Sequence, residues 1–384
     1  MMPIHSETDT IHSVIQTIAS LQSRGDAYFP KGIFLSYRQN KYLLYKRPDT
    51  NIFYTASIVF VINQLKPYLP VESQLIIEEI TAKAIQNYLA FQNKDGLKTY
   101  NFWQTPKEGR ASNHFPNGYI FRHSEHFRLP DDIDDTSLIY LTSQASKEEV
   151  LWLKEKLQLH ANLSEGPTRK RQVRNTFEYY KALKIYSTWF GKNMAIEFDA
   201  CALCNLMYLF EQYQLPRNEY DIDSYQYLAG IIKRKEFINH PFQVSHNYAT
   251  APLVVYHLAR LLGEFHNTPL EDYRKDLIEL ALLLFEIEKV AMNKVLLQTS
   301  LLKLSRLNSF GFGEEIVNCL KAETPLNLQI PDPDFCYFLG PLLSSYEYPI
   351  LQFFAPMKIT QMDWKCEAHE WVLVLENLIE RSKN

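Results

Sequence analysis

The chain has 384 residues, of which 46% are hydrophobic, and its formal net charge at pH 7 is -4. This charge gives no reason to expect nucleic-acid binding, and 12 glycines are few for a β-sandwich or a nucleotide-binding α/β fold. Five cysteines without disulfide-like spacing, no signal-peptide pattern and no bilayer-length apolar run predict a soluble cytoplasmic protein.

The first 65 residues predict two helices separated by an irregular segment. Apolar residues between 8 and 22 recur at helical spacing, whereas 29–45 is aromatic and contains Pro30 and Gly32, which indicates a loop or short hairpin. The run 51–65 is rich in β-branched residues, but its length and its helical neighbours favour a buried helix.

A helix is predicted over 72–91, and Gln92, Gly96 and Trp103 follow it. This arrangement resembles the QW repeat of terpene cyclases and the related repeats of protein prenyltransferases, with a longer spacing between the glycine and the tryptophan. The resemblance implies that Gln92 caps the next helix and stacks on Trp103, which ties outer helices together.

A long polar loop is predicted over 104–130, and it ends directly before an acidic stretch. Loops of this length in compact domains are usually functional or disordered. His126 and Arg128 are therefore candidate substrate-binding residues beside the acids, with ordinary exposed loop residues as the alternative.

The acidic stretch places Asp131, Asp132, Asp134 and Asp135 between Pro130 and an apolar run. Proline stops a helix arriving from upstream and aspartate caps helix N-termini, so a helix is expected to begin among these acids. Carboxylates this close raise the pKa of at least one of them, which makes the stretch a candidate general acid. The alternative is an N-cap at Asp131 or Asp132, with the other acids favoured by the helix dipole.

The run 132–137, Asp-Ile-Asp-Asp-Thr-Ser, resembles the DxDDT(A/S) motif of class II terpene cyclases of the squalene-hopene type. The resemblance implies that Asp134 protonates an alkene or epoxide and that Asp132 and Asp135 orient and polarise it. A second alignment, Asp131-Asp132-x-x-Asp135, resembles the metal-binding DDxxD motif of class I terpene synthases, but no second metal motif follows. No cofactor is therefore expected, with Mg²⁺ only for a substrate that carries a diphosphate.

Helices are next predicted over 135–143, 147–159, 176–190 and 194–213. Asp199 and Asn205 lie in the apolar last helix, where buried polar groups need partners, so we expect both to be buried and hydrogen-bonded. Asp199-Ala200-Cys201 also resembles the Asp-x-Cys zinc ligands of protein prenyltransferases, with His246 or His257 as the third ligand. The surrounding residues depart from that motif, and a buried cysteine acting as a small hydrophobe is the alternative.

The remaining chain continues the helical pattern, with helices predicted over 221–234, 271–289, 293–307, 313–320 and 365–381 and another ending at Leu262. Four basic residues within 169–174 could hold a substrate diphosphate or form an exposed loop. Together with the resemblance, this predicts an all-α, single-domain (α/α)6 toroid at 51–384, after an N-terminal helix and irregular aromatic segment at 1–50.

The resemblance implies a class II terpene cyclase-like protein acting on a small isoprenoid substrate, with Asp134 as the general acid. The residues expected around the substrate are Arg128, His126, Asp199, Asn205 and His246. A non-catalytic binding or scaffold protein and a carbohydrate-active (α/α)6 enzyme with paired carboxylates are the alternatives. A peripheral membrane or partner-protein contact stays open. Aromatic walls around Asp134 would favour the cyclase, a polar cleft with two carboxylates the glycosidase, and a filled centre the scaffold.

Overall fold

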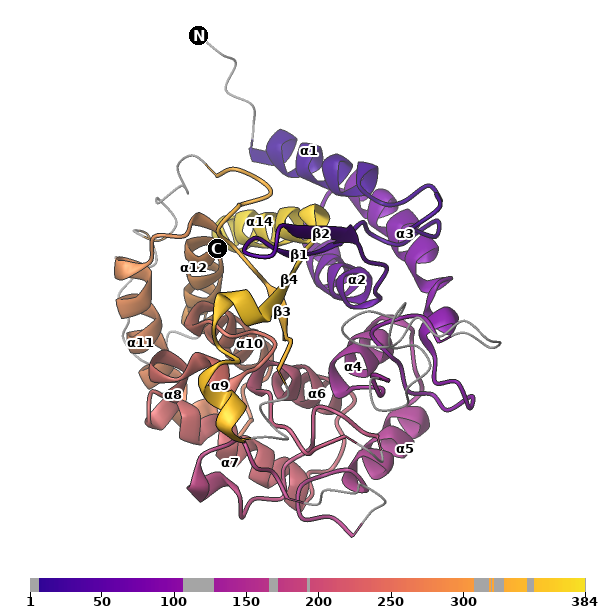
Figure 1. Cartoon of the computed structure of the whole chain (residues 1–384). Coiled ribbons are helices and arrows are strands. Elements are labelled where there is room, and N and C mark those ends of the chain that lie inside the picture. The colour runs from indigo at the N-terminus through magenta and orange to yellow at the C-terminus, as the bar shows by residue number, and fades with distance from the viewer. Residues whose placement is uncertain are drawn as a thin grey trace.

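The computed structural model describes residues 7–105, 128–165, 172–191, 194–306, 318, 320, 328–343 and 349–383. These residues form a mainly helical molecule in which six helices follow one another in a closed circle of contacts (Figure 1). In order around the circle they are α2 (Phe53–Leu65), α4 (Ile133–Thr142), α6 (Ala200–Gln212), α10 (Ala251–Glu264), α12 (Ala291–Ser305) and α14 (Glu367–Ser382).

A second set of helices lies outside this circle (Figure 1). It comprises α1 (Glu7–Ser20), α3 (Val71–Ile85), α5 (Lys147–Gln158), α7 (Glu219–Lys233) and α11 (Arg274–Ile287). α1 contacts α14 and α3, α3 contacts α2, and α11 contacts both α10 and α12. The short helices α8 (Glu236–Asn239) and α9 (Pro241–Val244) lead from α7 towards α10. Within the described part of the chain, no helix has the length and apolar character needed to cross a bilayer.

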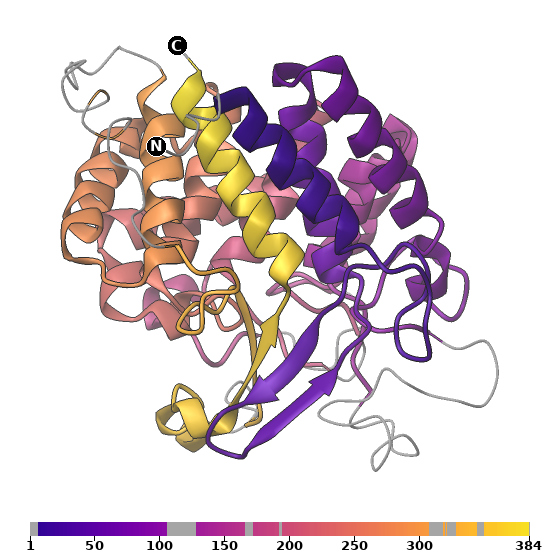
Figure 2. The same ribbon diagram turned by 90° about the horizontal axis from the view of Figure 1, so that it is seen from above.

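The expected all-α class needs one correction, because the structure also contains a small antiparallel sheet. Its strands run in the order β2 (Tyr45–Pro48), β1 (Tyr37–Asn40), β4 (Gln361–Lys365), β3 (Phe338–Pro341). Figure 2 shows the sheet at one end of the helices, the end at which α14 begins. The β1–β4 pairing joins the two ends of the sequence in one sheet, and the expected boundary near residue 50 stays a prediction.

The buried helix expected at 51–65 is present, and the hairpin expected within 29–45 forms from β1 and β2. The helix expected at 176–190 is absent apart from a single 3₁₀ turn at Glu178–Tyr180. Backbone groups of this segment find partners outside it, because Asn162 Nδ2 donates to the carbonyls of Lys181 and Leu183. Ile133 N also donates to Thr188 O at 2.9 Å, so the segment lies beside the acidic stretch in extended form.

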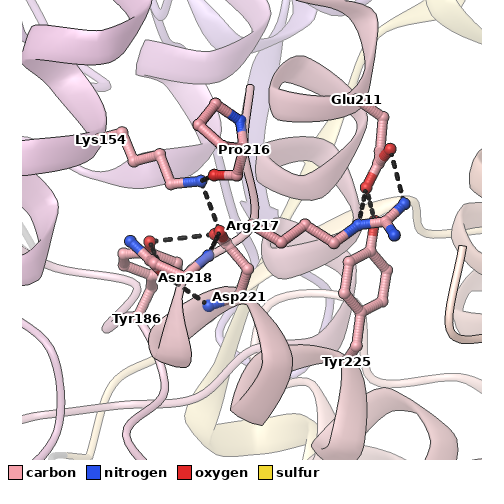
Figure 3. Close-up of polar contacts among 8 residues, drawn as sticks. All are labelled: Lys154, Tyr186, Glu211, Pro216, Arg217, Asn218, Asp221 and Tyr225. Atoms are coloured by element: carbon pink, nitrogen blue, oxygen red, sulfur yellow. Dashed lines mark hydrogen bonds and ion pairs between the residues drawn. The ribbon is translucent and has the colours of Figure 1, made fainter. Parts of the chain in front are cut away.

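Buried ion pairs fix the outer helices to their neighbours (Figure 3). Lys154 of α5 pairs with Asp221 of α7, and both side chains are 3% exposed. Asp221 also accepts from the Tyr186 hydroxyl at 3.1 Å, and Arg217 binds Glu211 through two hydrogen bonds. The buried charges of Lys154 and Asp221 compensate each other, as their desolvation requires.

Candidate functional site

The acidic stretch forms the start of α4, with Asp132 as the N-cap. Its Oδ1 accepts from the backbone N–H groups of Asp134 at 3.0 Å and Asp135 at 2.8 Å. This confirms the capping interpretation for Asp132, and it leaves the other carboxyls free for different partners. Asp131, Asp132, Asp134 and Asp135 are all buried, with relative exposures of 7% or less.

Asp131 is bound to the turn that precedes the long loop. It accepts from Asn93 Nδ2 and Thr99 Oγ1, both at 2.6 Å, and burial raises its pKa while these bonds and the charge of Arg128 lower it. Gln92 was expected to cap the next helix and stack on Trp103. Its amide N–H groups instead donate to the carbonyls of Gly96 and Leu97 inside this turn. The turn therefore positions the acids.

Asp132 and Asp135 are buried carboxyls that lie close together at the start of α4. Burial and the charge of Asp134 raise the pKa of Asp132 to about 8, and burial and the charge of Asp132 raise the pKa of Asp135 well above its usual range. Asp135 Oδ1 is buried and has no hydrogen-bond partner among the described residues, which disfavours the ionised form of this carboxyl. At neutral pH the pair therefore retains a proton.

Asp134 faces the interior of the circle of helices. One of its oxygens, Oδ1, accepts from Asn205 of α6, and the other, Oδ2, accepts from the hydroxyl of Tyr248. Burial raises its pKa to about 6, the hydrogen bonds from Tyr248 and Asn205 lower it, the charge of Asp199 raises it, and Arg260 lowers it. A substantial protonated fraction of Asp134 is therefore present just below neutral pH.

Arg260 of α10 fixes the direction of these hydrogen bonds. Its Nη2 donates to Asn205 Oδ1, and its guanidinium stacks 5.0 Å from the ring centre of Phe60. Because arginine can only donate, the oxygen of the Asn205 amide must face Arg260 and the amide NH₂ must face Asp134. Asp134 Oδ1 is then an acceptor, so a proton on this carboxyl resides on Oδ2, beside Tyr248.

Asp199 and Asn205 are buried and hydrogen-bonded, as predicted, with exposures of 0% and 2%. Asp199 was expected inside a helix beginning near 194, but it is instead the N-cap of α6. It also accepts from Ser245 Oγ and from Asn247 N at 3.1 Å, so it holds the segment that carries Tyr248. No cluster of three or more His, Cys, Asp or Glu side chains that could hold a metal ion occurs in the described ranges.

His246 lies on the wall of a cavity of about 60 Å³ near the start of α6. The wall consists largely of aromatic side chains, with one buried carboxyl: Phe102, Trp103, Trp189, Phe338 and Trp364 with Glu197 and His246. His246 Nε2 contacts Asn175 Nδ2 at 2.7 Å, and burial lowers its pKa to about 4. His126 and the basic residues expected to bind diphosphate at 169–171 lie outside the described residues.

Aromatic side chains fill the end of the circle next to Asp134. Tyr248 packs against Phe53, Tyr337 and Phe338 with ring centres 5.5–6.0 Å apart, and Phe53 and Phe338 are 4.6 Å apart. Phe338 is the first residue of β3, and Tyr337 directly precedes it. Figure 1 shows β3 lying across the middle of the circle in this view. The rings around Asp134 are aromatic, as the cyclase interpretation expects, and they pack closely at this end of the circle, as the scaffold interpretation expects.

Sequence reasoning missed Tyr248, Arg260 and Glu197. Each lies more than 50 residues from Asp134 in the sequence, and only the fold brings them together. Arg260 had a detectable signal, because it is the one charge in the apolar run Leu253–Leu262. A buried arginine in such a run needs a partner.

No protein-family model matches the chain, and no curated protein matches it by sequence. Among solved structures, the chain is similar to a variant of the type II terpene cyclase MstE from Scytonema in complex with its substrate geranylgeranyl dihydroxybenzoate. The alignment covers 98% of this chain and 97% of that one, with a TM-score of 0.53 and 10% sequence identity. This chain therefore shares the fold of a type II terpene cyclase over nearly its whole length.

Proposed function

We propose that this protein is a class II terpene cyclase-like enzyme in which Asp134 protonates an alkene of a small isoprenoid substrate. In this proposal the circle of six helices is the inner ring of an (α/α)6 toroid. The observation that supports it most is the setting of Asp134, a buried carboxyl with a pKa raised to about 6 at the edge of an aromatic cluster. The shared fold with a type II cyclase supports the same assignment.

The proposed step transfers the proton from Asp134 Oδ2 to one carbon of a substrate double bond. The O–H bond breaks, a C–H bond forms from the π electrons, and the other carbon becomes a cation. The remaining carboxylate is stabilised by the Asn205 amide and the Tyr248 hydroxyl, both of which already donate to it. Faces of neighbouring aromatic rings such as Phe53 and Phe338 attract the developing positive charge.

The other predicted residues take supporting roles in this proposal. Asp132 caps α4 and presents Asp134, while Asp135 retains a proton and limits the negative charge beside the acid. Asn205 orients the acid directly, and Asp199 holds the segment of Tyr248 through Ser245. Arg128 acts from a greater distance through its charge on Asp131.

Substrate entry requires a change in the packed aromatic side chains at this end of the circle. Closely packed rings occupy the space beside Asp134 and Tyr248, whereas small-molecule sites usually measure about 300–1,000 Å³. We propose that Tyr337 and Phe338 move with β3 to admit the isoprenoid. The close packing of these rings is also the observation that favours the second candidate, a non-catalytic scaffold of the same fold.

The test is a turnover assay with Asp134→Asn. Purified protein is incubated with prenyl diphosphates, squalene and prenylated aromatic compounds, and cyclic products are identified by mass spectrometry. Wild type should form a product, and Asp134→Asn should form none while keeping its fold, because asparagine preserves the shape but lacks the acidic proton. Asp334→Asn, at an exposed acid of comparable size, is the matched control and should retain activity.

An active Asp134→Asn variant would contradict the role of Asp134. No product from any substrate class, together with a change in stability alone, would favour the scaffold.

A further inference from the structure

The cavity lined by Glu197 and His246 contains a carboxyl without a counter-charge. Glu197 is 1% exposed, and its Oε2 accepts no hydrogen bond from the residues that the structure describes. No ion pair involves Glu197 within those ranges, and His246 is neutral at pH 7 because burial lowers its pKa. A buried polar atom without a partner is costly, so a group that enters this cavity and donates to Oε2 would be stabilised.

The rest of the wall suits a positive charge. Three tryptophans, Trp103, Trp189 and Trp364, face this cavity together with two phenylalanines. Tryptophan is the aromatic side chain that attracts cations most strongly. The wall is held in place, because the indole N–H groups of Trp103 and Trp364 both donate to Asp49 Oδ1 at 3.0 Å.

The neighbouring carboxyls Glu197 and Asp199 also favour a positive charge in this cavity. Burial and the neighbouring Asp199 raise the pKa of Glu197 to about 8, against a smaller lowering by the Trp189 indole. The two carboxyls repel each other's negative charge, and a cation between the aromatic rings and Glu197 would relieve this repulsion. The volume of about 60 Å³ corresponds to roughly two water molecules at their share of liquid volume, which limits the group to about two heavy atoms.

We propose that this cavity binds the primary ammonium end of a small organic ligand. The ammonium N–H donates to Glu197 Oε2, and its charge lies against the tryptophan rings. This site goes beyond the acid chemistry proposed for Asp134, which does not line the cavity, although Phe338 belongs both to this wall and to the cluster beside Asp134.

The test is a titration of the full chain with methylammonium at about pH 8.5, where an alkylamine is still mostly charged. Tryptophan fluorescence and NMR chemical shifts report binding. Methanol is the neutral probe of the same size, and tetramethylammonium is the cation that is too large. Methylammonium should bind saturably and at least roughly tenfold more tightly than either.

Glu197→Gln should weaken methylammonium binding roughly tenfold or more, because it removes the charge and keeps the shape. Glu178→Gln, whose side chain is 86% exposed, is the matched control and should bind like wild type. Phe338→Leu removes one ring and should weaken binding several-fold, which provides a second variant if Glu197→Gln does not fold.

Equal binding of methylammonium and methanol, or binding unchanged in both variants, would overturn the proposal. Asp134→Asn should leave methylammonium binding intact, so a failure of this proposal is distinguishable from a failure of the proposed cyclase activity.

Discussion

At the scale of single residues, the direction of each hydrogen bond determines what Asp134 can do. Arg260 donates to Asn205, and Asn205 donates to Asp134, so both protein neighbours on this side stabilise the ionised carboxyl. Burial disfavours the ionised form, and the two opposing effects place the pKa of Asp134 at about 6. A general acid benefits from this balance, because the proton is retained near neutral pH and is still transferable.

Asn205→Leu tests this balance. The change removes one donor and weakens the link to Arg260, so the pKa of Asp134 should rise by about one pH unit. Asp134 is active when protonated, so wild-type activity should fall as pH increases through about 6, and the variant's activity should fall at higher pH. Carboxyl infrared or ¹³C NMR titration measures the same pKa without any substrate, and Asn239→Leu at an exposed position is the control. An unchanged pKa would show that Asn205 only fills space.

At the scale of elements, sequence reasoning succeeded where the signal is local. The start of α4 was predictable because proline, capping acids and the apolar run occur within ten residues, and the buried helix α2 was predictable from its length. The prediction of a helix over 176–190 was wrong, because Asn162 and the acidic stretch form hydrogen bonds with the backbone of this segment from elsewhere in the chain. Tyr248 and Arg260 could not be assigned to Asp134 for the same reason, since no local pattern encodes a contact between distant helices.

The Lys154–Asp221 pair offers a test of how α5 is attached to α7 (Figure 3). Lys154→Met alone should lower the free energy of unfolding by about 3–5 kcal/mol, because it leaves Asp221 buried without its cation. The double variant Lys154→Met with Asp221→Leu should recover much of this loss, since neither charge then remains. Urea denaturation measures both values, and Lys83→Met in the exposed pair with Glu79 is the control, with an expected change of less than about 1 kcal/mol. Equal losses in the single and double variants would mean that packing, not charge, dominates.

At the scale of the whole molecule, the chain closes a circle of helices and then places its own β3 segment across one end of it. The solved cyclase MstE is aligned over 97% of its chain, so the two chains share one fold over nearly their whole length. What distinguishes the cyclase from the scaffold is whether the aromatic side chains of β3 leave the centre when a ligand enters.

Tyr337→Ala tests this directly. Tyr337 is 4% exposed and packs 4.2 Å from the ring centre of His369 and 5.6 Å from that of Tyr248, so its removal leaves a cavity in the centre. Without ligand, the variant should lose about 3–5 kcal/mol of unfolding free energy. If the centre is the isoprenoid site, a prenyl alcohol should raise the melting temperature of the variant more than that of wild type, because the ligand fills the new space without displacing tyrosine. Leu270→Ala creates a buried cavity outside the proposed site and should show no such gain. An equal response of the two variants would mean that the ligand fills any hole in the core, and the scaffold interpretation would then be the better one.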